Sequence, residues 1–483
     1  MPRLFEWPDY WLLTDFSAHI GFFLGLIFLA HLIRQRRSPA STMAWLLIIL
    51  FLPYVGVPLY LMLGGRKMNR MARRKPRVYD RVGPADPRRI EGHQGTERFL
   101  LSYGVPPARE GNRLELLTQG EVAFRRLVEL IDSATCSIHV TTYILGRGRV
   151  GREIVERLAR RARDGVSVRL LLDSVGSRRV RRSDLATLRE SGAAIAYFMP
   201  VLHVPFRGRA NLRNHRKIVI VDRQVALTGG MNFAWPYMGP DPEAGLWRDL
   251  SVVVQGPAIV DLDALFLSDW KFATGEVLQG GYPGPDGELE SHEPTPPALT
   301  GSLGTPSTVQ VVASGPDVPD DPLYETLVSL IFAASKRIWI VTPYFVPDEM
   351  LARALTLAAR RGVDIRLIVP QRSNHLSTDL ARESYLRDLH EAGGMVFLYQ
   401  PVMMHAKAVL IDDQLAVVGS ANMDNRSLFL NYEVALFVYS RESVEELATW
   451  ALGLQADSLR ELPQPGWLRE LAESVVRLLA PLL

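Results

Sequence analysis

The sequence predicts an α/β fold in which two similar halves form one catalytic unit, preceded by an apolar helical hairpin. The first observation is a motif, H-x-K-x4-D-x6-G-[GS]-x-N, which occurs twice with identical spacing, at 215–232 and 405–422. The second is that apolar strand patterns alternate with amphipathic helical patterns around both copies, which is typical of mostly parallel sheets. The third is a pair of long apolar runs near the N-terminus. A string repeated with this spacing indicates a duplication.

The N-terminal apolar runs cover about 16–33 and 43–63, and each has about the length needed to cross a bilayer. A secretory signal peptide is the competing interpretation of the first run, but the second run and the missing small-residue cleavage site disfavour it. The second run contains three residues that permit a kinked or re-entrant path: Pro53, Gly56 and Pro58. We expect a transmembrane hairpin that, with its basic flank, occupies 1–75.

Basic residues flank these runs, and their numbers bear on orientation. The connection carries Arg34, Arg36 and Arg37, and the second run is followed by Arg66, Lys67, Arg70, Arg73, Arg74 and Lys75. The larger group is expected on the cytoplasmic side, which places the rest of the chain there in a multi-pass arrangement, although the loop arginines weaken this. The larger group either attracts anionic lipid headgroups or serves only as a topology signal.

After the hairpin, the order of the segments follows the duplication. We expect a linker at 76–112, a first half at 113–274, a Gly- and Pro-rich linker at 275–308, a second half at 309–465 and an amphipathic helix at 466–483. The C-terminal helix either packs on the catalytic body or lies at the membrane surface. The first half alone has an insertion before its motif, whose arginines either contact a lipid phosphate or are solvated: Arg207, Arg209 and Arg213.

Composition excludes several classes of protein. The net charge of +3 over 483 residues does not support extensive wrapping of nucleic acid. The single cysteine, Cys136, excludes an internal disulfide framework and cannot build a zinc site by itself. It lies in an apolar strand pattern, so we expect a packed thiol.

The chemistry of the motif follows from its placement on a strand. Residues 217–222 and 407–412 are apolar runs between the motif Lys and Asp, so each copy lies on a buried strand. Side chains two apart on a strand share a face, so each His projects beside its Lys. A neutral imidazole beside an ammonium suits attack on a phosphodiester. A lysine beside the histidine repels a metal ion and no carboxylate cluster accompanies it, so we expect neither a metal nor a cofactor.

With these residues in view, the chain resembles the two-motif phospholipase D superfamily, and its context resembles bacterial cardiolipin synthases. That context is Asn214-His215-Arg216-Lys217, Gly419-Ser420-Ala421-Asn422, Asp424-Asn425-Arg426-Ser427 and Asn431-Tyr432-Glu433. The resemblance covers essentially the whole chain. One departure is Gly146-Arg147-Gly148-Arg149, where many relatives carry acidic residues, and it concerns headgroup contacts rather than the catalytic set.

The resemblance implies that both motifs meet in one site across a pseudo-twofold axis. One histidine attacks phosphorus to form a phosphohistidine, and the other protonates the leaving alkoxide and then deprotonates the acceptor. We take His215 as the nucleophile and His405 as the acid and base. The residues expected to bind the phosphoryl group are Lys217, Lys407, Asn232 and Asn422, with Gly230 and Ser420 permitting close backbone approach.

Each histidine also needs a carboxylate that fixes its tautomer. We assign Asp249 to His215 and Glu433 to His405, because the two acids stand in comparable positions downstream of the motifs. Asp222 and Asp412 belong to the motif, and we expect them to have a structural role at the end of the strand.

The reaction that the resemblance implies is cardiolipin synthesis at the bacterial inner membrane: one phosphatidylglycerol is attacked, glycerol leaves, and a second phosphatidylglycerol resolves the intermediate. The expected partners are phospholipids and the membrane, not nucleic acid. A phospholipase D hydrolase or another phosphatidyltransferase shares every catalytic residue and stays open. A membrane-tethered nuclease is less favoured. A non-catalytic lipid-binding scaffold is expected to lose a motif residue, and both motifs are intact.

Overall fold

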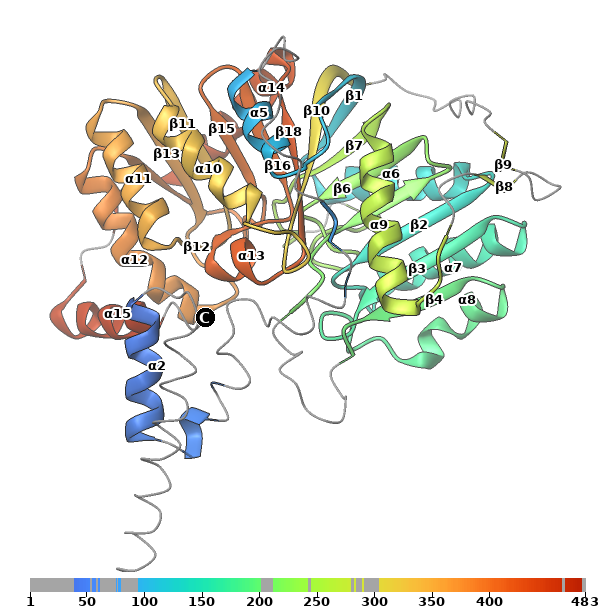
Figure 1. Cartoon of the computed structure of the whole chain (residues 1–483), viewed down its shortest axis with the longest axis horizontal. Helices are drawn as coiled ribbons and strands as arrows, with labels where there is room; N and C mark the ends of the chain where they lie inside the picture. Colours follow the sequence, from blue (N-terminus) through green and yellow to red (C-terminus); the bar gives the residue numbers. More distant parts are fainter. Residues whose placement is uncertain are drawn as a thin grey trace, which may run out of the picture.

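The computed structural model describes residues 39–52, 54–57, 60, 75, 77–79, 94–200, 212–241, 245–278, 282–283, 289–290, 304–462 and 465–479. The first predicted apolar run and most of the arginine-bearing insertion lie outside these residues. The two halves stand side by side, and helix α2 (Pro39–Phe51) projects from one end of the body (Figure 1).

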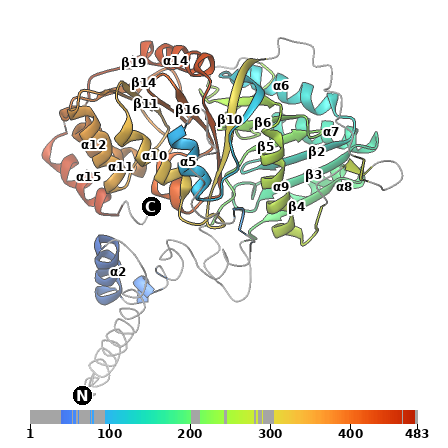
Figure 2. The same ribbon diagram turned by 45° about the horizontal axis from the view of Figure 1, so that its top comes forward.

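One sheet of 15 strands runs through both halves. At its centre the antiparallel pair β1 (Arg109–Leu117) and β10 (Thr305–Ser314) joins them (Figure 2). Outward through the first half follow β7 (Ser251–Gln255), β6 (Val225–Gly229), β5 (Ile218–Val221), β2 (Ser137–Thr142), β3 (Ser167–Asp173) and β4 (Ala194–Phe198). Outward through the second half follow β18 (Glu433–Val438), β16 (Leu415–Gly419), β15 (Ala408–Ile411), β11 (Arg337–Val341), β13 (Asp364–Pro370), β14 (Met395–Tyr399) and β19 (Ser458–Leu459).

The predicted α/β architecture is present, but the expectation of mostly parallel strands is wrong. Within the 15-stranded sheet, only β2-β3-β4 and β11-β13-β14 pair in parallel, and the strands from β5 to β1 and from β15 to β10 are antiparallel. The reason is local: the motif strands β5 and β6 are joined by a tight hairpin, which can only connect antiparallel neighbours.

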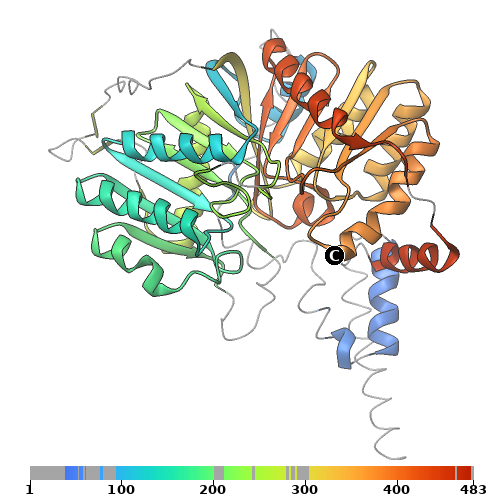
Figure 3. The ribbon, with the colours of Figure 1, turned by 180° about the vertical axis from the view of Figure 1, so that it is seen from behind.

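Both faces of the sheet are buried, which explains why the motif strands are apolar throughout. In β5, Ile218 and Ile220 belong to the core beneath α9, whereas Val219 and Val221 belong to the core beneath α6 and α7. The helices on the two faces are seen in Figures 1 and 3. Those of the first half are α6 (Gly120–Ser133), α7 (Arg149–Arg163), α8 (Ala186–Glu190), which follows the 3-10 turn Arg182–Leu185, and α9 (Ile259–Thr274).

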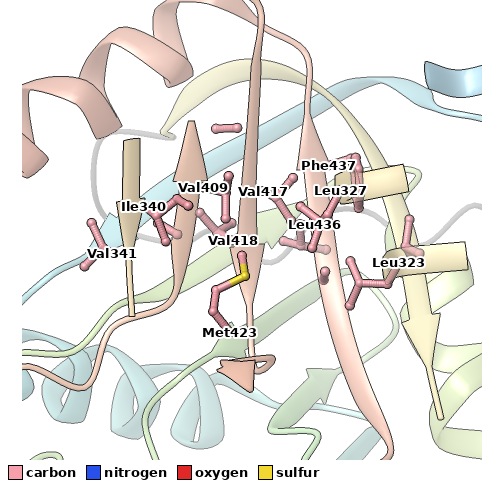
Figure 4. Close-up of a cluster of buried hydrophobic side chains, with 14 of the residues drawn as sticks. Leu323, Leu327, Ile340, Val341, Val409, Val417, Val418, Met423, Leu436 and Phe437 are labelled. Atoms are coloured by element: carbon pink, nitrogen blue, oxygen red, sulfur yellow. The ribbon is translucent and has the colours of Figure 1, made fainter. Parts of the chain in front are cut away.

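The second half repeats this packing. Its helices are α10 (Pro322–Ala333), α11 (Glu349–Arg360), α12 (Leu376–Glu391), α13 (Asn425–Phe429) and α14 (Arg441–Ala456). Leu323 and Leu327 of α10 lie over Val417 of β16 and its neighbour Phe437 of β18 (Figure 4). Shorter pairs are β12 (Phe345–Val346) with β17 (Met423–Asp424), and β8 (Tyr282–Pro283) with β9 (Leu289–Glu290).

The second predicted apolar run does not form one straight helix. Helix α2 has 13 residues, about 20 Å of helix, and the chain then turns back along it. Gly56 lies against α2, where a Cβ would stand 2.6 Å from the Ile48 carbonyl oxygen, and the Tyr60 ring packs edge-on against Trp45 at 5.3 Å. Within the residues described here, we find no helix whose length and apolar character suffice to span a membrane.

Three further expectations need correction. The predicted linker at 76–112 contains helix α5 (Gln94–Ser102), which packs near α10, and the start of the central strand β1. Cys136 is exposed in a bend before β2 rather than packed in the strand, because the strand begins one residue later. Lys75, expected to attract lipid headgroups or to serve as a topology signal with the other basic residues of its flank, is only 2% exposed.

The C-terminal helix α15 (Trp467–Leu479) packs against α12. Glu473 is buried and pairs with Arg387 of α12 at 2.5 Å and with Arg469 at 3.0 Å. Trp467, Leu468 and Leu471 are exposed on its other side. Helix α15 therefore covers the body with one face and presents a second apolar face outward, at the end of the molecule from which α2 projects (Figures 1 and 3).

Candidate active site

Each motif histidine lies just before its strand and is joined by backbone hydrogen bonds to the opposite half. The His215 N–H donates to the carbonyl of Tyr432 over 2.9 Å, and the His405 N–H donates to the carbonyl of Arg248 over 2.6 Å. These contacts form two short parallel bridges across the interface, Asn214 with Tyr432 and Arg248 with Met404. The backbone therefore places both histidines at the boundary between the halves.

The carboxylates are exchanged between the halves, so the predicted pairing is wrong. His215 Nδ1 lies 3.0 Å from Glu433 Oε2, and His405 Nδ1 lies 2.7 Å from Asp249 Oδ2. The reason is the bridging just described: Glu433 follows Tyr432 and Asp249 follows Arg248, so each acid is carried to the histidine of the other half. Both acids are completely buried. With Nδ1 engaged, Nε2 is the nitrogen left for chemistry in each ring.

The motif lysines stand beside the histidines, as the strand spacing predicted. Lys217 Nζ donates to the His215 carbonyl over 2.6 Å, and it lies 5.6 Å from the centre of the Tyr143 ring. Lys407 Nζ donates to the His405 carbonyl and lies 2.6 Å from His405 Nδ1. Both lysines are at least 97% buried, so their charge acts through little intervening water.

Aromatic rings line the site around the two imidazoles. Tyr143 meets His215 edge-on with 4.9 Å between ring centres. Tyr237, Trp247 and Tyr344 surround His405 at 5.0, 5.5 and 6.2 Å. None of these four rings belongs to the repeated motif. Tyr237 lies in the loop between β6 and β7. The repeated spacing of the second half contains no position equivalent to Tyr237, so the duplication did not predict a role for this residue.

Asp222 and Asp412 lie at the far ends of β5 and β15, away from the histidines. The Asp222 carboxylate accepts hydrogen bonds from the N–H groups of Thr135, Cys136 and Ser137 over 2.7 Å each. Asp412 does the same for 335–337. Both have φ near +50°, a conformation that Asp tolerates better than most residues. The motif aspartate is therefore explained by the hairpin turn and by the start of the neighbouring strand.

The Gly-Gly and Gly-Ser pairs face protein groups. A Cβ on Gly229 would lie 2.5 Å from Ser251 Cα, and one on Gly419 would lie 2.3 Å from the Val434 carbonyl oxygen, so these glycines let adjacent strands approach. At the next position, a Cβ on Gly230 would lie 2.2 Å from Asp249 Oδ1. The equivalent Ser420 hydroxyl donates to the Glu433 carboxylate. This pair of positions therefore shapes the two carboxylate environments.

The motif asparagines line the same region. Asn232 Oδ1 accepts from the Ile144 N–H over 3.2 Å, and Asn422 Nδ2 donates to the Ser427 hydroxyl over 3.1 Å. Asn422 Oδ1 is buried and has no hydrogen-bond partner among the described residues. Within that same part of the chain, no three His, Cys, Asp or Glu side chains gather in a way that would hold a metal ion.

Burial controls the protonation of the site. Burial lowers the pKa of Lys217 to about 7 and that of Lys407 to about 8, even though Glu433 and Asp249 oppose the effect. Burial, followed by the charge of Lys407, lowers the pKa of His405 to about 3, and burial also lowers the pKa of His215. Both imidazoles are therefore neutral at pH 7.

The two acids behave in the opposite way. Burial raises the pKa of Asp249, but the charge of Lys407 and the hydrogen bond with His405 outweigh it and bring the pKa below its ordinary value. Burial likewise raises the pKa of Glu433, and His215 and Lys217 bring it below its ordinary value. The result is two ionised carboxylates that hold two neutral imidazoles, each ready to accept a proton or to attack an electrophile at Nε2.

Comparison with known proteins places these features in a family. The family model described as "Cardiolipin synthase, PLD-like domain" matches residues 127–270 and 327–454, and that described as "Phospholipase_D-nuclease N-terminal" matches 23–65. The chain is 33% identical over 471 residues to cardiolipin synthase 1 of Bacillus anthracis, covering 93% of this chain and 90% of that protein. It is 33% identical over 495 residues to cardiolipin synthase of Halalkalibacterium halodurans, covering 98% and 95%. The fold is similar to that of phosphatidylserine synthase from Haemophilus influenzae, with a TM-score of 0.60, 16% identity, and 80% of this chain and 100% of that one covered.

Proposed function

Because the chain belongs to the family of bacterial cardiolipin synthases with phospholipase D-like domains, we propose that it transfers a phosphatidyl group from one phosphatidylglycerol to another. The protein is a phosphatidyltransferase of phospholipid biosynthesis. The observation that carries the proposal is the pair of crossed dyads, His215 with Glu433 and His405 with Asp249, in one buried site with two lysines.

The proposed reaction has two displacements at phosphorus. In the first, Nε2 of one histidine bonds to phosphorus, the bond from phosphorus to the glycerol oxygen breaks, and the other histidine protonates that oxygen. In the second, the deprotonated histidine takes a proton from a hydroxyl of the second phosphatidylglycerol, whose oxygen attacks phosphorus and expels the first histidine. One phosphodiester replaces another, so the exchange is nearly neutral in energy and needs no nucleotide.

We propose His215 as the nucleophile and His405 as the acid and base. Support comes from access, since the His215 side chain is 11% exposed and that of His405 is 4% exposed. His405 is neutral in the empty site. The negative charge of a bound phosphodiester raises the pKa of His405, which takes up a proton from solvent and passes it to the leaving alkoxide, while His215 attacks in its neutral form. Trapping of a phosphatidyl adduct tests the assignment: the adduct should persist in His405→Ala and be absent in His215→Ala. The reverse pattern would exchange the roles.

We propose that Lys217, Lys407, Asn232 and Asn422 bind the phosphoryl oxygens. Each ammonium has three N–H donors, and the contacts to the histidine carbonyls leave donors for a ligand. The negative charge of a bound diester raises the pKa of both lysines and so favours their charged forms. Two buried cations facing one diester would then stabilise charge that builds up on the equatorial oxygens in the transition state.

We propose attachment to the bacterial inner membrane, which the exposed apolar surfaces support. We propose that the catalytic body lies on the cytoplasmic side, because the larger group of basic residues follows the second apolar run. The side chains exposed on α2 and its return are Met43, Leu47, Leu50, Phe51, Leu52, Tyr54 and Val55, and those on α15 are Trp467, Leu468 and Leu471. A multi-pass arrangement requires 43–63 to straighten, whereas a re-entrant segment keeps the reversal at Gly56. Labelling of Ser38→Cys and Gly65→Cys in a Cys136→Ser background separates them: labelling from opposite sides supports multi-pass, and labelling from one side supports re-entry.

Product analysis tests the reaction. Purified protein is incubated with phosphatidylglycerol vesicles, and the products are identified by mass spectrometry beside His215→Ala and His405→Ala. Cardiolipin plus glycerol, absent in both variants, is the expected result. Phosphatidic acid in place of cardiolipin would make the protein a phospholipase D, because the same residues serve when water is the acceptor. Four aromatic rings surround the two imidazoles, those of Tyr143, Tyr237, Trp247 and Tyr344. Exclusion of water by these rings favours transfer to a lipid over hydrolysis.

A further inference from the structure

A buried cluster of four charges lies behind His215, outside the catalytic dyads. Its members are Lys75, Arg216, Asp269 and Asp317, each no more than 2% exposed. Lys75 Nζ pairs with Asp269 and, over 2.5 Å, with Asp317. Arg216 pairs with Asp269 over 2.8 Å and with Asp317 over 3.7 Å. Two cations therefore balance two anions in a volume that water does not reach.

This cluster holds both chain neighbours of His215. The Asp269 carboxylate accepts from Asn214 Nδ2 over 2.8 Å on one side of the histidine and from Arg216 on the other. Arg216 also donates through Nε to the backbone carbonyl of Glu433 over 3.1 Å, so the same guanidinium touches the segment that carries the orienting acid. A shift of Asp269 would therefore be felt at both partners of the His215 dyad.

Lys75 connects this cluster to the membrane-proximal segment. It follows the second apolar run, whereas Asp269 belongs to α9 of the first half and Asp317 follows β10 of the second. The connection is reinforced nearby: the Val78 N–H donates to the Asp317 carbonyl over 3.2 Å, and the Ala313 N–H donates to the Tyr79 hydroxyl over 2.8 Å. Lys75 therefore bridges the two halves without belonging to either, and Val78 and Tyr79 hold the chain beside it against the second half.

We propose that Lys75 is a positioning residue for the reaction at His215, acting through Asp269 on Asn214 and Arg216, and that it couples the membrane-proximal segment to the active site. This assignment rests on the proposed site. Lys75 therefore has a role distinct from the one that the sequence predicts for the basic residues before it, which is to attract lipid headgroups or to serve as a topology signal.

The charge of Lys75 predicts a shift in the pH profile of the reaction, which a residue that served only in packing would not produce. Without Lys75, Asp269 and Asp317 face Arg216 alone, and the cluster acquires one negative charge. Negative charge near an imidazole favours its protonated form, so His215 would gain a proton at higher pH. The titratable groups that face His215 directly are Glu433, Lys217, Lys407 and Tyr143, and they remain in the variants below.

The experiment uses the full chain on phosphatidylglycerol vesicles and follows glycerol release, which both transfer and hydrolysis produce. Lys75→Met should lower kcat/KM at pH 7 by about tenfold or more and move the acid limb of the pH profile to higher pH. Lys75→Arg should keep the acid limb in place. Arg74→Met, a matched change at the preceding basic residue, should leave the acid limb unmoved.

A second variant keeps the test informative if Lys75→Met does not fold. Lys75→Met combined with Asp317→Asn leaves Arg216 and Asp269 as a balanced pair, so it should fold and return the acid limb to the wild-type position. The proposal is overturned if the acid limb of Lys75→Met, or of Lys75→Ala where the Met variant does not fold, coincides with that of the wild type. It is also overturned if the double variant keeps the limb displaced. Formation of phosphatidic acid by the wild type would refute cardiolipin synthesis while leaving this comparison intact.

Discussion

His215 Nδ1 lies 3.0 Å from Glu433 Oε2, so the imidazole of the first half is oriented by an acid of the second. The reciprocal pair, His405 with Asp249, crosses the interface in the other direction. Neither half therefore contains a complete His–carboxylate dyad. The duplication has produced one active site that exists only when the halves are joined by the central strands β1 and β10.

The crossed pairing predicts which catalytic step each acid serves. Glu433→Gln removes the acid from the proposed nucleophile, so the phosphatidyl adduct should not form. Asp249→Asn removes it from the proposed acid and base, so the adduct should form slowly and accumulate. Each change should lower kcat by about 10²- to 10⁴-fold, measured by product formation together with adduct trapping. Glu445→Gln, at an exposed pair with Arg441, serves as the control. Adduct accumulation in Glu433→Gln would refute this assignment of steps.

The sequence predicts those parts of the site that depend on residues close together in the chain. The positions of His215, Lys217, His405 and Lys407 follow from a repeated spacing on an apolar strand, and the structure places each lysine beside its histidine. The structural role of Asp222 also follows from its place at the strand end. These inferences need only the period of a strand and the position of a turn.

The inferences that failed depend on how segments distant in the sequence meet. The order of residues within each half suggests that Asp249 serves His215, but the bridge between Arg248 and Met404 carries Asp249 to the other half. The burial of Lys75 depends on Asp269 and Asp317, nearly 200 and more than 240 positions away. The sequence permits a kinked or re-entrant path at Gly56, but the choice between that path and a straight span depends on contact with Ile48, which hydropathy along the sequence does not report.

Substitution by alanine at the position after the first motif glycine should lower activity by different amounts in the two halves, where this position is Gly230 and Ser420. Gly230→Ala places a Cβ 2.2 Å from Asp249 Oδ1, so the carboxylate must move away from His405, and activity should fall by about 10²-fold. Ser420→Ala removes only a hydroxyl that donates to Glu433, and about a tenfold loss of kcat/KM is expected. Steady-state kinetics on vesicles measures both. Gly453→Ala is the matched control, because its Cβ would meet no atom within 4 Å. Equal activity in Gly230→Ala and Gly453→Ala would contradict the packing argument.

Asp222 should matter for stability and not for the chemical step. Its carboxylate accepts from three consecutive N–H groups and from the Thr135 hydroxyl, and it is 3% exposed. Asp222→Asn keeps a residue that tolerates the positive φ but loses the charge and one acceptor oxygen. The free energy of unfolding should fall by about 2 to 3 kcal/mol in urea denaturation. The pH profile of kcat/KM in the folded variant should match that of the wild type, and a displaced profile would place Asp222 in the reaction instead.

The low pKa of His405 predicts how stability depends on pH. In the folded protein its pKa is about 3, and in the unfolded chain it returns to the ordinary value of 6.5. Between these values the unfolded state binds a proton that the folded state does not, so stability falls as pH falls from 6.5 to 3. The slope from this one group is at most about 1.4 kcal/mol per pH unit. Above pH 6.5 both states are neutral, and the effect vanishes.

His405→Gln removes this titration while keeping a polar side chain beside Asp249. The difference in free energy of unfolding between wild type and variant should therefore change between pH 7 and pH 4, with the wild type losing more stability on acidification. Urea denaturation at a series of pH values measures the two slopes, and His375→Gln, a change at an exposed histidine, controls for the loss of an imidazole in itself. Parallel slopes for wild type and His405→Gln would show that His405 titrates near its ordinary pKa in the folded protein. The lowered pKa of His405 in the empty site would then be excluded.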